Sequence, residues 1–444
     1  MKPSDAPIPN TCAFSRCGPL LGAMLFAVCA VQPVLAAGIA STDVMQGFPP
    51  AVEMRVNKAN AFIQPYLRWS MRHAREVSPT RSILRAERPL SLPVGTRLDL
   101  GALMFTAGDE TLDLETYLQK TVTDGLIVLH RGTIVFEQYM DGFNDRQPHI
   151  WASMTKSVTG LLAAQFIAEG KLDPHARLAR YVPELSGTPF GESTVRQNLD
   201  MQVAVTYPDV PPDLGLFAAT GLIPRRPDMP GDIYSFLQVS EMAQGTVSQP
   251  LFFYQNGSPE ALAWALRRIS GQNWAELVSE RIWSRFAQED AYVQVDELGT
   301  EMASGGISSN LRDTARFAEL VRRELGRDVA GDSFNQAVRS LLDTGDAELF
   351  AKGNLGPGRP GYAYRNYWLQ KNDGDGSLEA SGRFGQKIYI NPKREIVIVK
   401  LSATPDQARR ATSADGPAKV ASRVIDAPVT FNNMVSAMLD AMPQ

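Results

Sequence analysis

The stretch WASMTKSVTG, residues 151–160, holds the one place in the 444-residue chain where a serine is followed three positions later by a lysine. An apolar run comes directly after it, so the stretch is predicted to open a helix. On a helix, positions i and i+3 lie about one turn apart on the same face, so the Ser153 hydroxyl and the Lys156 amine can meet. A neutral amine placed there can take the proton of a serine that is otherwise too weak an acid to attack a carbonyl. The stretch therefore predicts an activated serine nucleophile.

This Ser-x-x-Lys pattern also has a purely structural interpretation. An exposed helix start, with a capping serine and a solvated lysine, has the same spacing. Short patterns of this kind also arise by chance in a chain of 444 residues. The catalytic interpretation therefore depends on other segments that supply a proton shuttle and a site for the developing negative charge.

A candidate proton shuttle lies in the string Tyr-Gln-Asn at 254–256, directly before a predicted helix over about 258–270. Two other Tyr-x-Asn strings, at 364–366 and 389–391, fall in strand-like segments, where sheet packing explains the alternating side chains. Tyr254 instead lies at a loop–helix junction, a position that often presents a side chain to a cleft. Tyr254 and Asn256 are therefore candidate site residues.

A candidate oxyanion site lies where the chain enters a predicted strand at about residue 387. The segment before it contains Ser381, Gly382 and Arg383, preceded by Ala380. A glycine at a strand entry allows a carbonyl group to approach the backbone closely, as an oxyanion hole requires. The segment therefore supplies a plausible third part of an acyl-transfer site.

The order of the predicted elements indicates the fold class. Strand patterns occur at 125–136 and again at 387–401, with mostly helical material between them. This arrangement predicts an α/β fold of the α+β kind: one antiparallel sheet, built from both ends of the chain and flanked by helices. We expect an N-terminal arm over 38–110 and a main domain over 111–444, with a mainly helical subdomain inserted at about 165–360.

The N-terminus is predicted to be a signal peptide over residues 1–37. Basic residues precede an apolar run over 20–35, and small residues follow it. A retained membrane anchor is the alternative, although the run is short for a full span. Cys12, Cys17 and Cys29 all lie in this leader, so the processed chain would contain no cysteine. A bacterial periplasmic or secreted location follows as an expectation.

The composition bears on which kinds of partner the protein can bind. A net charge of −4 with scattered basic residues gives no footprint for nucleic acid. The four histidines lack the spacing of metal ligands, and no cofactor-binding motif with the required context occurs. We therefore expect no metal, no cofactor, no nucleic acid and, once the leader is removed, no stable membrane association. The oligomeric state is left open.

Taken in order, Ser153–Lys156, Tyr254–Asn256 and Ser381–Gly382 resemble the three motifs of the serine β-lactamase and penicillin-binding-protein superfamily. The resemblance is strongest to its class C-like branch, which includes family VIII carboxylesterases and 6-aminohexanoate-dimer hydrolases. It spans nearly the whole processed chain and implies a β-lactamase-like fold.

The resemblance also implies a role for each site residue. Ser153 would be the nucleophile that forms an acyl-enzyme, and Lys156 would be its base. Tyr254 would carry protons to the leaving group and help to activate water, while Asn256 would bind substrate or Lys156. The backbone N–H groups of Ser153 and Arg383 would form the oxyanion hole. No cofactor is implied.

One departure from the family bears on the substrate. Ala380 stands where lactam-binding relatives have a lysine, so a cation suited to a substrate carboxylate is missing. This favours esters or linear amides, of the 6-aminohexanoate-oligomer type, over β-lactams. Arg383 could replace the charge if its side chain turned inward. A β-lactamase or D-alanyl-D-alanine carboxypeptidase, and a non-catalytic penicillin-binding-like sensor, are the alternatives.

Overall fold

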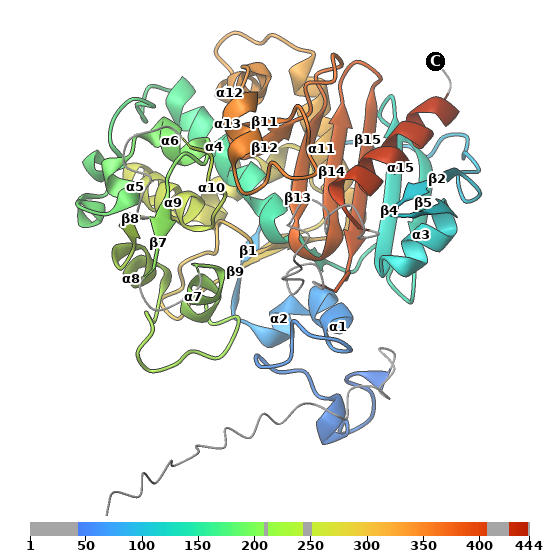
Figure 1. Cartoon of the computed structure of the whole chain (residues 1–444), viewed down its shortest axis with the longest axis horizontal. Helices are drawn as coiled ribbons and strands as arrows, with labels where there is room; N and C mark the ends of the chain where they lie inside the picture. Colours follow the sequence, from blue (N-terminus) through green and yellow to red (C-terminus); the bar gives the residue numbers. More distant parts are fainter. Residues whose placement is uncertain (1–42, 208–211, 243–250, 406–425, 443–444) are drawn as a thin grey trace, which may run out of the picture. The chain divides into compact units, whose positions relative to one another are not determined.

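A seven-stranded antiparallel sheet forms the centre of the protein (Figure 1). The structure, a computed structural model, describes residues 43–207, 212–242, 251–405 and 426–442. The strand order is β11-β12-β13-β14-β15-β4-β5. The strands are β4 (Thr123–His130), β5 (Thr133–Tyr139), β11 (Ala363–Arg365), β12 (Trp368–Gln370), β13 (Leu378–Gly382), β14 (Gln386–Asn391) and β15 (Ile396–Ser402).

The sheet joins the two ends of the chain, as the sequence predicted. Strand β15 pairs with β4 in a register that places Val397 opposite Leu129, and β4 pairs with β5 in a hairpin. Both β4 and β15 are buried along almost their whole length because each face of the sheet is covered. The expected antiparallel sheet flanked by helices is therefore confirmed.

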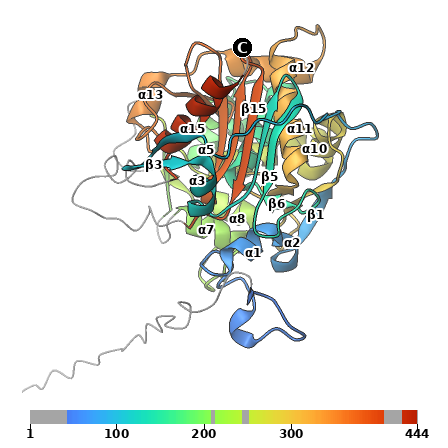
Figure 2. The same cartoon turned by 90° about the vertical axis from the view of Figure 1, so that its right-hand side faces the viewer.

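Alternate residues of the central strands face two different helical layers. Ile127 packs into the core that contains α4 and α11, whereas Val128 packs into the core beneath α3 and α15. Figure 2 shows these layers on opposite sides of the sheet. The covering helices are α3 (Leu114–Lys120), α4 (Thr155–Ala168), α11 (Leu311–Leu325) and α15 (Pro428–Ala441).

Helix α4 is the buried centre of the helical part. Its residues are buried on every side from Thr155 to Phe166, as expected for a helix enclosed by other elements. A side chain at Gly160 would place its Cβ 2.1 Å from the Asn366 carbonyl oxygen, so glycine permits a loop to approach the helix. The surrounding helices are α5 (Pro189–Glu192), α6 (Val195–Leu199), α7 (Pro212–Ala219), α8 (Ile233–Gln238), α9 (Gly257–Ser270), α10 (Trp274–Arg281), α12 (Ser333–Arg339) and α13 (Ala347–Lys352).

The range 165–360, predicted as an inserted helical subdomain, also contains elements of other parts of the fold. Helix α11 packs against the seven-stranded sheet. Two strands in the range join a second sheet with the order β1-β9-β10-β6. Its strands are β1 (Thr80–Ile83), β6 (His149–Ile150), β9 (Ala291–Gln294) and β10 (Ile307–Ser309), and a short hairpin is formed by β7 (Val205–Thr206) and β8 (Glu241–Met242).

The N-terminal arm is tied into both sheets. Its helices α1 (Leu67–Arg72) and α2 (Ala74–Val77) pack around Ile150 and Phe384, and β1 pairs with β9. The end of the predicted arm forms part of the core beneath α15, through the hairpin of β2 (Met104–Ala107) and β3 (Glu110–Asp113).

The fold does not test the predicted leader, because residues 1–37 lie outside the described residues. Within the described ranges, no helix combines the length and the apolar character needed to cross a membrane. In the same ranges, no group of three or more His, Cys, Asp or Glu side chains is arranged to hold a metal ion.

Candidate active site

The structure brings the Ser153 hydroxyl and the Lys156 amine together. Lys156 Nζ lies 3.0 Å from Ser153 Oγ, and Lys156 is 1% exposed. The same nitrogen donates to Asn256 Oδ1 at 2.7 Å and to the backbone oxygen of Ser304 at 2.8 Å. Among the described residues, the three oxygens that accept from Lys156 Nζ are a hydroxyl, an amide oxygen and a backbone carbonyl, and all three are neutral. The amine is therefore held in place by dipoles at a buried position.

The backbone before Ser153 makes a sharp turn that presents the hydroxyl. Ser153 lies in the 3-10 turn Ala152–Met154, which leads directly into α4. Ala152 has a φ of 47°, a conformation that residues other than glycine rarely adopt. The buried Trp151 side chain fixes the turn to the core, because its indole N–H donates to Ser309 Oγ at 2.9 Å. Ser153, two residues later, is half-buried.

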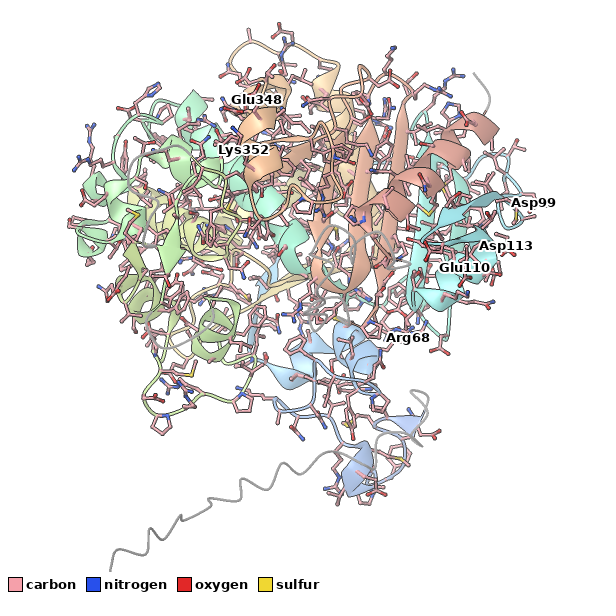
Figure 3. The ribbon with its side chains drawn as sticks, viewed as in Figure 1. Arg68, Asp99, Glu110, Asp113, Glu348 and Lys352 are labelled. Atoms are coloured by element: carbon pink, nitrogen blue, oxygen red, sulfur yellow. The ribbon has the colours of Figure 1, made fainter. Side chains whose placement is uncertain are left out.

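Tyr254 lies beside the amine. Lys156 Nζ is 5.1 Å from the centroid of the Tyr254 ring. The backbone of Tyr254 is held by Asn354, whose Oδ1 accepts from the Tyr254 N–H at 2.7 Å and whose Nδ2 donates to the Tyr254 carbonyl at 2.8 Å. Asn354 follows α13, the helix marked by Glu348 and Lys352 in Figure 3. Both backbone groups of the predicted proton shuttle therefore depend on one amide side chain.

Strand β13 ends against the turn that carries Ser153. A Cβ atom on Gly382 would lie 2.3 Å from the carbonyl oxygen of Trp151. Only glycine allows this approach, because any side chain would force the strand and the turn apart. This close approach places the backbone at Gly382 and Arg383 beside the turn that carries Ser153. The oxyanion hole from the N–H groups of Ser153 and Arg383 stays a prediction.

The side chain of Ser381 belongs to a buried ion pair. Its hydroxyl donates to Glu379 Oε1 at 2.5 Å and accepts from Lys387 Nζ at 2.8 Å, while Lys387 Nζ lies 2.7 Å from Glu379 Oε1. Burial acts to raise the pKa of Glu379, but the positive charges of Lys387, Lys371 and Arg359 outweigh burial and lower the pKa to about 2. Ser381 therefore binds charged protein groups through its side chain.

Lys387 is a residue whose place the sequence did not reveal. Position 380 is alanine, where lactam-binding members of the family that the motifs resemble have a lysine. In the sheet, Lys387 of β14 pairs directly with Ser381 of β13. The short connection over 383–385 fixes this register. Aligning residues 378–382 and 386–391 as a hairpin would therefore have placed Lys387 opposite Ser381 from the sequence.

Arg383 packs its side chain on aromatic rings. Its guanidinium carbon lies 5.7 Å from the centroid of the Phe217 ring and 5.1 Å from that of Phe384. Phe62 of the arm stacks on both of these rings, at centroid distances of 6.3 Å and 6.0 Å. Residues from the arm, from α7 and from the strand entry thus form one aromatic support next to the predicted oxyanion site.

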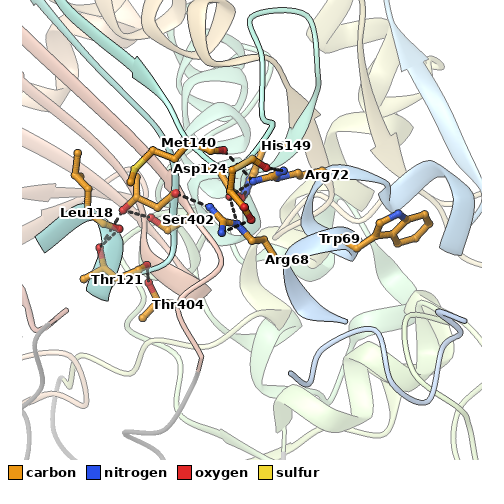
Figure 4. Close-up of polar contacts among 12 residues, drawn as sticks. Arg68, Trp69, Arg72, Leu118, Thr121, Asp124, Met140, His149, Ser402 and Thr404 are labelled. Carbon is orange, nitrogen blue, oxygen red and sulfur yellow. Dashed lines mark hydrogen bonds and ion pairs between the residues drawn. The ribbon is translucent and has the colours of Figure 1, made fainter. Parts of the chain in front are cut away.

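A buried charged cluster fastens the arm to the strand that precedes Ser153 (Figure 4). Arg68 Nε lies 2.6 Å from Asp124 Oδ1, and Arg72 binds the same oxygen. His149 Nε2 lies 2.9 Å from Asp124 Oδ2, and its Nδ1 lies 2.9 Å from the Ile150 carbonyl oxygen. Burial acts to raise the pKa of Asp124, but hydrogen bonds and charges from His149 and Arg72 lower it below its usual range.

Comparison with known proteins identifies the family. A model of the beta-lactamase family matches residues 113–421. The 6-aminohexanoate-dimer hydrolase of Paenarthrobacter ureafaciens is 31% identical over 353 residues, which cover 78% of this chain and 88% of that protein. A solved Bacillus anthracis structure, provisionally named a 6-aminohexanoate-dimer hydrolase, is 31% identical with a TM-score of 0.75 and covers 89% of this chain and 100% of that one.

A more distant structure supports the fold alone. An octameric penicillin-binding protein homologue from Pyrococcus abyssi has a TM-score of 0.53 and 16% identity. The match covers 73% of this chain and 74% of that one. The β-lactamase-like fold expected from the three motifs is therefore confirmed.

Proposed function

This chain belongs to the beta-lactamase family, and on that premise we propose that it hydrolyses carboxylic esters or linear amides through an acyl-enzyme on Ser153. One observation carries the proposal: the 3.0 Å contact between Ser153 Oγ and a buried Lys156 amine. Asn256 Oδ1 and the Ser304 carbonyl accept from Lys156 Nζ and hold it beside Ser153 Oγ, within reach of the hydroxyl proton.

The proposed reaction follows the positions of the side chains. Lys156 takes the Ser153 proton while Oγ attacks the substrate carbonyl, and the backbone N–H groups of Ser153 and Arg383 stabilise the resulting oxyanion. Tyr254 protonates the leaving alcohol or amine as the acyl-enzyme forms. In the second half, Tyr254 takes a proton from the water that attacks the acyl-enzyme, and Lys156 returns its proton to Ser153 Oγ as the acid leaves.

The substrate class rests on the charges near the strand entry. Position 380 is alanine, and the nearby Lys387 is engaged by the carboxylate of Glu379. A cation already paired in this way binds a substrate carboxylate weakly, because that carboxylate must compete with the buried glutamate. This favours substrates without a carboxylate, such as neutral esters, over β-lactams. The linear-amide alternative rests instead on the 31% identity to a 6-aminohexanoate-dimer hydrolase.

Export to the periplasm or the medium is part of the proposal. It rests on the basic and apolar pattern of residues 1–37. N-terminal sequencing of the protein recovered from a bacterial periplasm is expected to begin near residue 37 or 38. A chain that keeps Met1 in the cytoplasm contradicts export without affecting the catalytic proposal.

Labelling with a fluorophosphonate, followed by intact-mass measurement, tests the nucleophile. We expect one adduct on the wild type, none on Ser153→Ala, and an unchanged adduct on Ser157→Ala. Ser157 is the matched control because it is a serine of the same helix whose hydroxyl donates to the Tyr367 carbonyl. An unlabelled wild type, or equal labelling of Ser153→Ala, contradicts the proposal and favours a non-catalytic sensor.

A substrate panel tests the reaction class. p-Nitrophenyl butyrate, the 6-aminohexanoate dimer and nitrocefin are assayed side by side with the wild type and Ser153→Ala. We expect Ser153-dependent turnover of the ester, the linear amide or both. Rapid nitrocefin hydrolysis without ester or amide turnover identifies a β-lactamase instead.

A further inference from the structure

A buried carboxylate on α9 lies next to the Ser153–Lys156 pair without touching either residue. Glu260 is fully buried and follows Asn256 by four positions, about one helical turn. Its Oε1 accepts from the Ser304 N–H at 2.8 Å, and its Oε2 accepts from the Ala303 N–H at 3.1 Å. Both carboxylate oxygens are thus used to hold two consecutive backbone amides.

The segment that Glu260 holds is the one that supplies an acceptor to Lys156. The Ser304 carbonyl accepts from Lys156 Nζ at 2.8 Å. Helix α4 holds the other side of the segment, because Thr159 Oγ1 donates to the Ala303 carbonyl at 2.7 Å. The position of the Ser304 oxygen is therefore set between α4, which carries the amine, and α9, which carries Glu260.

We propose that Glu260 is a positioning residue for Lys156, acting through the backbone of Ser304. Helix α9 then orients the amine by two routes: directly through Asn256 Oδ1 at 2.7 Å, and indirectly through Glu260 and the Ser304 carbonyl. The proposal rests on the function proposed above, since it gives Glu260 a role only where Lys156 is the base.

The donor and acceptor count explains why a carboxylate is needed. Two N–H groups point at Glu260, and a carboxylate offers an acceptor oxygen to each. Glutamine has almost the same shape but offers one oxygen and one NH₂ group. In Glu260→Gln an NH₂ group would face an N–H, so the segment must shift and carry the Ser304 carbonyl away from Lys156. Small displacements of a catalytic group reduce turnover strongly.

Glu301 provides a matched control. It is also fully buried, lies three residues before Ser304, and accepts from the Ala275 N–H at 3.3 Å. Its carboxylate pairs with Arg81 and with Arg267 at 3.3 Å, not with a partner of Lys156. Glu301→Gln therefore applies the same chemical change at a similar depth and costs stability without acting on the amine.

The experiment measures kcat, KM and Tm of both variants with p-nitrophenyl butyrate, together with the rate of fluorophosphonate labelling. We expect Glu260→Gln to lower kcat and the labelling rate by about tenfold or more, with KM changed by less than about threefold. We expect Glu301→Gln to lower Tm at least as much while kcat stays within about threefold of the wild type. A Glu260→Gln enzyme with wild-type kcat overturns the proposal.

Two further variants keep the result decisive. Glu260→Asp retains both acceptor oxygens on a shorter side chain, so we expect a kcat between those of the wild type and Glu260→Gln. If Glu260→Gln does not fold, a Glu260→Asp enzyme with wild-type kcat overturns the proposal. Ser153→Ala separates the two hypotheses: turnover without Ser153 refutes the proposed function, whereas Ser153-dependent turnover with an unaffected Glu260→Gln refutes only the role of Glu260.

Discussion

Two buried lysines near the same strand entry have opposite surroundings. Lys156 is 1% exposed and donates to three neutral oxygens, on Ser153, Asn256 and Ser304. Lys387 is 6% exposed and donates to the Glu379 carboxylate at 2.7 Å and to Ser381 at 2.8 Å. Burial is nearly equal, so the difference lies in the partners.

This difference separates a lysine suited to chemistry from one suited to structure. Lys156 is hydrogen-bonded to the hydroxyl of the proposed nucleophile, and no carboxylate is among its three acceptors in the described part of the chain. Lys387 is placed to neutralise Glu379 within the sheet. Removing each lysine is therefore expected to damage a different property of the protein.

The largest expected effect is on turnover in Lys156→Met. Without the amine, Ser153 has no base, and we expect kcat for p-nitrophenyl butyrate to fall by about 10³-fold or more. The thermal midpoint should stay near that of the wild type, because methionine fills the space without leaving a buried charge unpaired. A Lys156→Met enzyme with kcat within tenfold of the wild type would show that the base is misassigned.

Lys387→Met is expected to damage stability instead. It leaves the buried Glu379 carboxylate without its nearest cation, so we expect the free energy of unfolding in urea to fall by about 3 kcal/mol. We expect kcat of the folded fraction to stay within about tenfold of the wild type. Changing both partners, in Lys387→Met with Glu379→Gln, should restore most of the stability. A double variant as unstable as Lys387→Met contradicts the ion-pair explanation.

Acid is expected to weaken the same ion pair. The pKa of Glu379 is lowered to about 2 in the folded protein from a usual value of 4.5, so the unfolded chain takes up the proton first. The stabilisation is fully present above about pH 5 and is lost as the pH falls toward 2, by an amount on the order of 2–3 kcal/mol. Urea unfolding between pH 3 and pH 6 measures this. The slope should be shallower in the double variant, and an unchanged slope there would assign the acid sensitivity to other carboxylates.

The smallest expected effect is in Asn354→Asp. The isosteric carboxylate still accepts from the Tyr254 N–H but places an oxygen against the Tyr254 carbonyl, so the tyrosine is expected to move. We expect kcat to fall by about three- to tenfold. Asn372→Asp is the control, because it removes a similar bond to a backbone carbonyl, that of Gly361, elsewhere in the loops. Equal kcat values in the two variants would mean that Asn354 does not position Tyr254.

The sequence anticipated those parts of the site that depend on local spacing. Ser153 and Lys156 lie three residues apart, so the chain geometry at the start of α4 brings them to one face. The helix predicted after Tyr254 is present as α9, Gly257–Ser270, and it ends at Gly271 in a left-handed conformation. The strands at 125–136 and 387–401 appear as β4, β5, β14 and β15 because their apolar residues fit a sheet buried on both faces.

The remaining parts of the site depend on contacts between distant segments. Glu260 reaches Ser304 across 44 positions, and Asn354 reaches Tyr254 across 100. Phe62 of the arm stacks on Phe384, whose ring also contacts Arg383, only because the arm folds back to the strand entry. No spacing rule connects such residues, since each contact exists only after helices and sheet have packed.

By itself, the sequence determined the Ser153–Lys156 pair, its helix and the antiparallel sheet, because spacing and periodicity act over a few residues. The tertiary structure alone decided which lysine is left with neutral partners. Neither Lys156 nor Lys387 has a local sequence that names the partner of its amine. Strand register gave Lys387 a carboxylate, whereas the meeting of α4, α9 and the 303–304 segment gave Lys156 dipoles. The partner of a buried charge is a property of packing.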